Sequence, residues 1–154
     1  LVAGDGPLRE KLQGLAVESG AAGKGVFLGE IPNNEITPYY HAASMFALPS
    51  VARSEAFGIV QIEAMTAGTP VVNTSLDSGV PFVSLDQITG LTVPPGDIGA
   101  LGAAINRLLD DADLRRRFGE AARARAESEF SVEIMKSRIL SLYRQVLTAR
   151  QAVP

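Results

Sequence analysis

The residues from Pro49 to Val72 constrain the fold of this chain more than any other stretch. A short apolar run at residues 45–48 ends at Pro49, and a loop follows it. Gly58 then opens an apolar segment that ends near Gly68, and a second apolar run follows. Short apolar runs of this kind are typical of buried parallel strands, and a glycine after an apolar helix is a common left-handed C-cap. The stretch therefore predicts a strand, a loop, a helix and a second strand.

Two acidic residues, Glu55 in the loop and Glu63 in the helix, are unexpected in so apolar a stretch. Glu63 has isoleucine, valine, methionine and alanine around it, so we expect its helix to be largely buried and its carboxylate to need partners. The first helical turn, residues 57–60, offers free N–H groups and the positive end of the helix dipole, which bind anions. An anion site between two carboxylates fits a ligand with a central diphosphate and hydroxyl groups at both ends, which describes a nucleotide sugar.

The segment Glu-Ala-Phe-Gly-Ile-Val-Gln-Ile-Glu, residues 55–63, resembles the E-x7-E motif of retaining glycosyltransferases with the GT-B fold, the large family 4 group. Three other blocks resemble the same family: Gly-Asp-Gly-Pro at 4–7, Phe-Leu-Gly at 27–29, and Gly-Leu-Thr-Val-Pro-Pro-Gly-Asp at 90–97. The resemblance covers nearly the whole chain in order. The alternative, two surface acids on an ordinary helix, does not explain all four blocks.

The resemblance implies that the two carboxylates bind opposite ends of the donor. Glu55, the catalytic residue, would hydrogen-bond the hydroxyls of the donor sugar, and Glu63 would accept from the ribose 2′ and 3′ hydroxyls. Backbone amides would meet the diphosphate and the sugar, namely those of Phe57, Gly58, Ile59 and Val60. The chemistry suits these roles, because a carboxylate can accept from both hydroxyls of a diol and glycine lets the backbone approach phosphate closely.

Three further residues are candidates for the donor site. The backbone near Ile31 would hold the base. Arg53, in the loop before Glu55, could steer phosphate, and the alternative is a solvated loop arginine. Gly4 belongs to a Gly-x-Gly turn that lacks a third glycine, so close packing of strand and helix is as good an interpretation as ligand contact. No metal site and no cofactor other than the donor substrate is expected.

The alternation of apolar runs and helical segments predicts an α/β fold: a Rossmann-like parallel sheet with helices on both faces, the C-terminal half of a GT-B fold. We expect one nucleotide-sugar-binding domain over residues 1–154, with an α/β core over 1–96 and helices over 97–154. The chain starts Leu-Val-Ala, which reads as the tail of a strand. We therefore expect the first strand and helix of the domain, and an acceptor-binding domain, to be missing.

Helix boundaries follow from caps and apolar spacing. One helix is expected from Pro7 to Ser19, and another from a cap at Asn33 or Asn34. Asp97 and Ser131 should cap two of the C-terminal helices. The last helix carries an apolar stripe, which we expect to dock on neighbouring structure and to be incompletely covered here: Met135, Ile139, Leu142 and Val146.

The composition narrows the classes of partner. A formal net charge of −3 argues against a nucleic-acid-coating surface, and Arg115–Arg117 is better interpreted as part of a solvated face than as a phosphate patch. The absence of cysteine excludes disulfides and thiolate metal sites and suits a cytoplasmic location. No apolar run is long enough to span a bilayer, so membrane contact is expected to be peripheral at most.

The family resemblance implies a glycosyltransferase that moves a sugar from a UDP- or GDP-sugar to an acceptor hydroxyl with retention of configuration, in bacterial polysaccharide or glycoconjugate synthesis. Residues 73–82 depart from the commonest family pattern and resemble a subgroup of bacterial cell-surface polysaccharide transferases, many of them mannosyltransferases, which suggests GDP-mannose. The acceptor, a sugar or a lipid-linked saccharide, would bind the missing domain. The alternatives are a non-catalytic nucleotide-sugar-binding module and a related GT-B enzyme such as a sugar epimerase.

Overall fold

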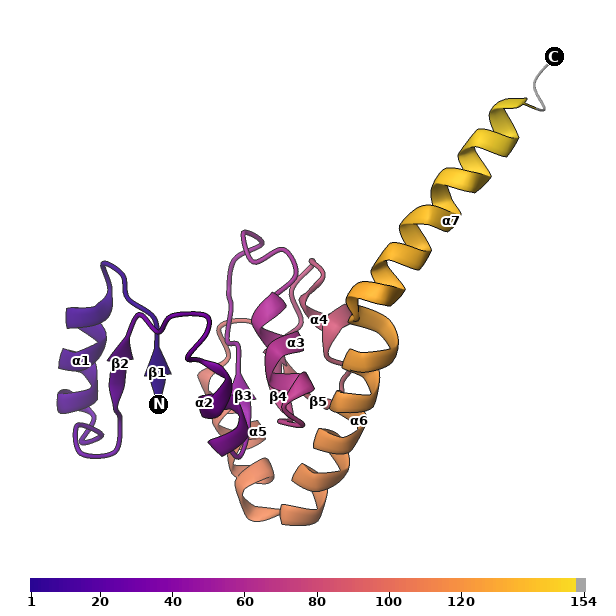
Figure 1. Ribbon diagram of the computed structural model, residues 1–154. Coiled ribbons are helices and arrows are strands. Elements are labelled where there is room, and N and C mark those ends of the chain that lie inside the picture. Colours follow the sequence, from indigo (N-terminus) through magenta and orange to yellow (C-terminus); the bar gives the residue numbers. More distant parts are fainter. Residues whose placement is uncertain (152–154) are drawn as a thin grey trace. The chain divides into compact units, whose positions relative to one another are not determined.

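The computed structural model describes the backbone of residues 1–151 and the side chains of residues 1–148. The chain forms two compact units, one from Leu1 to Pro38 and one from Tyr39 onward (Figure 1). The short helix α2 (Thr37–Ala42) spans their junction. The expectation of a single domain remains a prediction.

The first unit holds a parallel pair of strands and one helix. Strand β1 (Val2–Ala3) pairs with β2 (Phe27–Gly29), and α1 (Arg9–Glu18) connects them. The prediction that α1 starts at Pro7 is wrong, because the residues before Arg9 form a turn in which the Arg9 amide donates to the Gly6 carbonyl at 3.0 Å. The helix ends at Ser19 as predicted.

A second boundary also differs from the prediction. Neither Asn33 nor Asn34 caps α2, which begins at Thr37. Both asparagines lie inside a turn closed by the Glu35 amide, which donates to the Pro32 carbonyl at 2.8 Å. Asparagine suits turns and helix caps about equally, and the turn is the conformation adopted here.

The second unit is built on a three-stranded parallel sheet in the order β3-β4-β5. Its strands are β3 (Phe46–Ala47), β4 (Val71–Thr74) and β5 (Gly90–Val93). The helices are α3 (Ile59–Thr66), α4 (Val80–Val83), α5 (Ile98–Asp110), α6 (Ala112–Phe130) and α7 (Val132–Gln151). All strands of both units are parallel to their partners, as expected for a mixed α/β fold.

Both faces of the three-stranded sheet are covered. Val71 and Val72 are adjacent on β4, so their side chains point to opposite faces, and both are completely buried. One face packs into an apolar cluster with α5 and the start of α6: Val72, Leu91, Val93, Ala104, Leu108, Leu114 and Phe118. Burial on both faces is typical of a Rossmann-like sheet.

Helix α6 holds the end of α3 in place. A Cβ atom at Gly119 would lie 2.2 Å from the Gly68 carbonyl oxygen, so only glycine permits this approach. Gly68 has φ 78°, as predicted for the C-cap of α3. Arg123 donates from Nη2 to the Ala67 carbonyl at 3.0 Å and so satisfies a carbonyl at the end of the helix.

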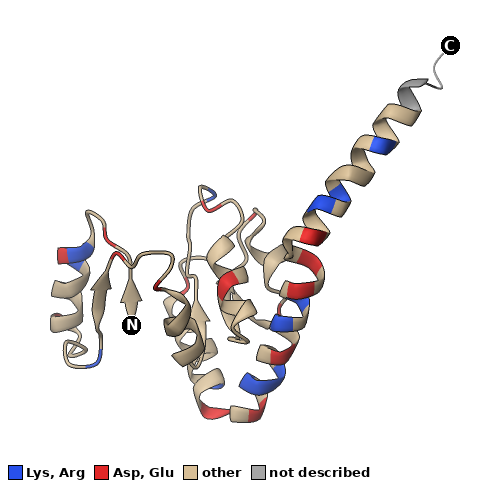
Figure 2. Ribbon diagram, viewed as in Figure 1, with Lys and Arg blue, Asp and Glu red and all other residues tan. Residues whose placement is uncertain are grey.

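Helix α6 carries charges of both signs (Figure 2), and Asp113, Arg116 and Glu120 among them are exposed. Arg116 pairs with Asp113 at 3.2 Å and with Glu120 at 3.5 Å. Arg115 instead donates to the carbonyls of Leu108 and Leu109 at the end of α5. These contacts favour a solvated, self-paired face over a phosphate patch.

The C-terminal helices follow their predicted caps. Asp97 accepts from the Ala100 amide at 2.8 Å, and Ser131 accepts from the Ile134 amide at 3.4 Å. The stripe on α7 is incompletely covered, as predicted: Met135 is 52% exposed, Ile139 44%, Leu142 56% and Val146 56%. None of the described helices is long and apolar enough to cross a membrane.

Candidate functional site

The predicted site lies where β3 and β4 end and α3 begins. The loop between β3 and α3 and the loop after β4 both leave the sheet at the carboxyl ends of its strands. The Leu48 amide donates to the Val72 carbonyl at 2.8 Å, which extends the strand pairing to the point where the first loop departs. In open parallel sheets ligands bind at this edge.

Glu55 is held against the start of α3. Its Oε1 accepts from the Gly58 amide at 3.0 Å, and its side chain is half-buried. Gly58 has φ 73°, and a Cβ there would lie 2.6 Å from Gln61 Nε2 and 2.8 Å from Leu48 Cδ2. The turn therefore requires glycine for both its conformation and its packing. It places one carboxylate at the positive end of the helix dipole.

Two backbone donors at the start of α3 are unused. Among the described residues, no hydrogen bond reaches the amides of Ile59 and Val60. Their side chains are 65% and 37% exposed. The first turn of α3 therefore presents two N–H groups next to the Glu55 carboxylate, an arrangement that can bind an anion.

Glu63 lies on the exposed face of α3, so the expectation that this helix is largely buried is wrong. Only part of the helix faces the core, through Gln61, Ala64 and Met65. Ile59 and Glu63 are four residues apart and share the opposite face. An apolar helix contributes only the face that its neighbours cover, and here the sheet and α6 cover one side of α3.

The partner of Glu63 is Tyr40 on α2. The Tyr40 hydroxyl donates to Glu63 Oε2 at 2.9 Å. Burial of the phenol, reinforced by the hydrogen bond to the Glu63 carboxylate, raises the pKa of Tyr40 above its ordinary value of 10.0. Tyr40 therefore remains a proton donor to Glu63 throughout the physiological pH range.

A buried polar network between α3, β4 and α4, which sequence reasoning missed, supports the site. Gln61 is completely buried and donates from Nε2 to the carbonyls of Phe57 at 3.2 Å and Val80 at 3.3 Å. Asn73 Nδ2 donates to Gln61 Oε1 at 2.9 Å, and Thr92 Oγ1 donates to Asn73 Oδ1 at 2.7 Å. The sequence signals that could have predicted this network were the amide side chains of Gln61, inside an apolar helix, and Asn73, inside an apolar strand.

The network joins the two loops of the site. It ties the carbonyl just before Gly58 to the first residue of α4. The Gly79 amide, just before α4, donates to the Ala56 carbonyl at 2.7 Å. The Phe57 ring packs against the rings of Phe82 and Phe130, at centroid distances of 6.5 and 6.0 Å. Phe57 is therefore anchored by its side chain and its carbonyl, and among the described residues its amide has no hydrogen-bond partner.

Arg53 is paired rather than free. Its guanidinium lies 3.2 Å from the Asp77 carboxylate, and the two side chains are 76% and 87% exposed. The pair links the same two loops directly, at the solvent-exposed surface. An exposed pair of this kind is weak, so an incoming phosphate could compete for the arginine.

Gly4 and Ile31 belong to the first unit. Gly4 has φ 118°, a conformation that favours glycine, and its amide donates to the Gly29 carbonyl at 2.7 Å. A Cβ at Gly4 or Gly6 would meet nothing within 4 Å, so close packing of strand and helix does not require these glycines. Ile31 is half-buried. Their roles in binding a donor remain predictions.

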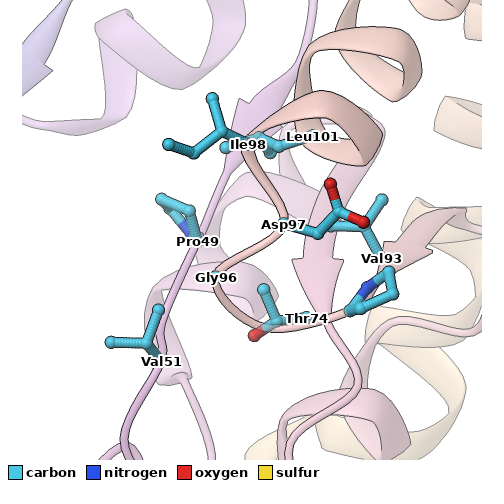
Figure 3. A pocket seen from close by; sticks show the side chains of 9 residues that line it. Pro49, Val51, Thr74, Val93, Gly96, Asp97, Ile98 and Leu101 are labelled. Atoms are coloured by element: carbon cyan, nitrogen blue, oxygen red, sulfur yellow. The ribbon is translucent and has the colours of Figure 1, made fainter.

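A separate cavity of about 160 Å³ opens at the carboxyl ends of the strands of the second unit (Figure 3). Its lining is mainly apolar and includes Pro49, Val51, Thr74, Val93 and Ile98. Asp97 also lines it, but this carboxylate already caps α5. The cavity contains neither Glu55 nor Glu63 and is smaller than the roughly 300–1,000 Å³ typical of ligand pockets.

The sequence profile of the family described as "Glycosyl transferases group 1" matches residues 1–125. The chain belongs to this family of glycosyltransferases. All four sequence blocks that carry the resemblance lie inside the matched residues.

Relatives with established names support this assignment. This glycosyltransferase chain is 29% identical to O-antigen chain mannosyltransferase C of Escherichia coli, over 97% of the chain and 40% of the relative. It is 33% identical to a GDP-mannose-dependent phosphatidylinositol monomannoside mannosyltransferase of Mycolicibacterium smegmatis, over 98% of the chain and 41% of the relative. The chain thus spans about two fifths of the length of these relatives.

Solved structures support the fold. Sucrose-phosphate synthase from Thermosynechococcus elongatus superposes with a TM-score of 0.83 and 37% identity, covering 94% of this glycosyltransferase chain and 35% of the synthase. Anabaena HepE in complex with UDP superposes with a TM-score of 0.85 and 25% identity, covering 93% and 40% of the two chains. The predicted Rossmann-like half of a glycosyltransferase fold is therefore confirmed.

Proposed function

We propose that this chain is the donor-binding half of a retaining glycosyltransferase that moves a sugar from a nucleoside-diphosphate sugar to an acceptor hydroxyl. The observation that carries the proposal is the exposed face of α3. It begins with the Glu55 carboxylate and the free amides of Ile59 and Val60, and it continues to Glu63. Glu63 follows Ile59 by four residues, or about 6 Å along the helix axis, a separation that a nucleoside diphosphate can span.

Each end of this face suits one part of the donor. The two amides would bind the diphosphate, where negative charge grows as the glycosidic bond breaks, and preorganised donors stabilise such charge. Glu55 has one oxygen bound to the Gly58 amide and a second oxygen available for the sugar hydroxyls. Glu63 would accept hydrogen bonds from both hydroxyls of the ribose diol, because an ionised carboxylate has two acceptor oxygens.

For the donor we propose GDP-mannose. The segment at residues 73–82 resembles a mannosyltransferase subgroup, and two similar proteins are named as mannosyltransferases, one of them GDP-mannose-dependent. HepE, which is similar in structure, was solved with UDP and with UDP-glucose, so a UDP-sugar is the competing donor.

We propose further that an acceptor-binding domain completes the enzyme and that the stripe on α7 docks on it. The exposed stripe, and the length of the relatives compared with this chain, support this arrangement. A sugar or lipid-linked saccharide acceptor, a role in bacterial polysaccharide synthesis, and a cytoplasmic location with at most peripheral membrane contact complete the proposal. This chain alone is then expected to bind nucleotides weakly and to transfer no sugar.

The test is a binding panel followed by a transfer assay. GDP, UDP, ADP and their sugars are titrated into the 154-residue chain and followed by protein NMR, which detects millimolar affinities. We expect a guanine nucleotide to bind best and to shift the amide signals of Ile59 and Val60. No binding of any nucleotide would contradict the donor site. Sugar transfer by the chain alone would contradict the need for an acceptor domain.

A further inference from the structure

Tyr40 is a firmly anchored side chain next to the proposed donor site. Its ring packs edge-to-face on Phe46, with a centroid distance of 5.6 Å and an interplanar angle of 78°. Its own carbonyl accepts from Thr69 Oγ1 at 2.8 Å. Tyr40 is 7% exposed and Thr69 is 3% exposed, so this hydrogen bond is buried, and the Phe46 ring is half-buried. The phenol therefore has a fixed position from which to direct its hydroxyl.

The Glu63 carboxylate, which accepts this hydrogen bond, has little else to hold it. Glu63 is exposed on α3, and the described residues offer its carboxylate no partner other than the Tyr40 hydroxyl, 2.9 Å from Oε2. A free glutamate on a helix surface samples several rotamers, and ordering it on binding costs free energy. One hydrogen bond from a rigid phenol removes part of that cost before a ligand arrives.

The same hydrogen bond leaves the carboxylate able to bind a diol. A carboxylate has about four acceptor positions, and Tyr40 occupies one of them. Oε1 and the second lone pair of Oε2 remain for two hydroxyl donors. The phenol donates, so it does not compete with the ribose hydroxyls for the same role.

We propose that Tyr40 is a positioning residue that holds the Glu63 carboxylate ready for the vicinal hydroxyls of the donor ribose. The proposal rests on the proposed function, in which Glu63 binds the ribose, and adds a residue 23 positions away from it in sequence. Tyr40 acts through Glu63 and does not itself touch the sugar. Its contribution should therefore depend on two things: the carboxylate of Glu63 and the hydroxyls of the ribose.

The experiment compares two ligands across five proteins. The ligands are GDP or UDP, whichever binds the chain more tightly, and the 2′,3′-dideoxy form of the same diphosphate. The proteins are the unchanged chain, Tyr40→Phe, Glu63→Gln, the double variant, and Tyr39→Phe as the matched control. Tyr39 adjoins Tyr40, is 38% exposed, and has no hydrogen bond from its hydroxyl among the described residues.

We expect Tyr40→Phe to weaken binding of the normal nucleotide about three- to tenfold and to leave the dideoxy nucleotide unaffected. Glu63→Gln should remove most of the preference for ribose hydroxyls. The double variant should lose no more than Glu63→Gln alone, because Tyr40 acts through that carboxylate. Tyr39→Phe should match the unchanged chain with both ligands.

The outcomes separate the two levels of the proposal. If Glu63→Gln keeps the full preference for ribose hydroxyls, the assignment of Glu63 to the ribose is wrong, and the role of Tyr40 is wrong with it. If Glu63→Gln loses the preference but Tyr40→Phe keeps it, Tyr40 does not position the carboxylate. If Tyr40→Phe weakens both ligands equally, Tyr40 supports the fold alone and the inference is overturned.

Discussion

The two faces of α3 are built in opposite ways. The inner face is covered by a buried polar network. In it, Asn73 donates a hydrogen bond to Gln61, and Gln61 donates to the backbone carbonyls of Phe57 and Val80. The outer face is open: it has free amides at its start, one carboxylate tied to Gly58 and another tied to Tyr40. The difference shows that buried hydrogen bonds hold the backbone under the site, while its binding groups remain accessible. Disturbing the inner face should affect folding, and disturbing the outer face should affect binding.

The largest effect is expected at Gly58, which belongs to both faces. Gly58→Ala has two costs: alanine is strained in the left-handed conformation of this position, and its Cβ would lie within 3 Å of Gln61 and Leu48. We expect a loss of about 2–5 kcal/mol in the free energy of unfolding, measured by denaturant titration. Gly96→Ala is the matched control, because it has φ 79° but nothing within 4 Å of the added Cβ. Equal losses for the two variants would mean that packing under the turn contributes nothing.

The next largest loss of stability is expected when the polar network of the inner face is disrupted. Asn73→Ala removes the donor to Gln61 Oε1, in a buried hydrogen bond, and the acceptor of Thr92 Oγ1, in a partly buried one. Buried polar groups that lose their partners cost about 1–3 kcal/mol each, so we expect about 2–3 kcal/mol of destabilisation by thermal or chemical unfolding. Asn106→Ala, on the exposed side of α5, should stay within about 0.5 kcal/mol.

Changes on the outer face should alter binding and leave stability nearly unchanged. Glu63→Gln removes a charge-assisted bond of about 1.5–3 kcal/mol and should weaken binding of the bare nucleoside diphosphate about tenfold or more. Glu55→Gln should leave that binding nearly unchanged, because the bare nucleoside diphosphate has the ribose but lacks the donor sugar that Glu55 would bind. In the complete enzyme, Glu63→Gln should mainly raise KM for the donor and Glu55→Gln should mainly lower kcat.

Calorimetric titration of both variants with the bare diphosphate checks this assignment. Glu127→Gln, an exposed change on α6, is the control. A larger loss for Glu55→Gln than for Glu63→Gln would mean that the two carboxylates have been assigned the wrong way round.

The smallest effect is expected at Arg53, which connects the two loops through a single solvent-exposed ion pair. Arg53→Ala breaks an ion pair whose partners are 76% and 87% exposed, so stability should change by less than about 1 kcal/mol. Asp77→Ala frees the arginine and is the informative companion. If Arg53 steers phosphate, Asp77→Ala should tighten diphosphate binding and Arg53→Ala should weaken it. Identical binding by the two variants would leave Arg53 as a solvated loop residue.

Local chemistry in the sequence was enough to predict most of the elements. Gly58 and Gly68 mark the two ends of α3, because only glycine adopts a left-handed conformation there without strain. Asp97 and Ser131 cap the helices predicted for them. The motif at residues 55–63 and its companion blocks were enough to identify the family, which the profile match confirms. Each of these signals depends on a few adjacent residues.

Tertiary structure decided which face of a helix is exposed and which side chains from distant segments are in contact. The apolar sequence of α3 does not say which side meets the sheet, so the exposure of Glu63 became clear only from packing against β4 and α6. The contacts of Glu63 with Tyr40 and of Gln61 with Asn73 join residues 23 and 12 positions apart. No local pattern specifies such pairs, because they form only when separate elements pack together and the buried polar groups must find partners among whatever the fold brings near.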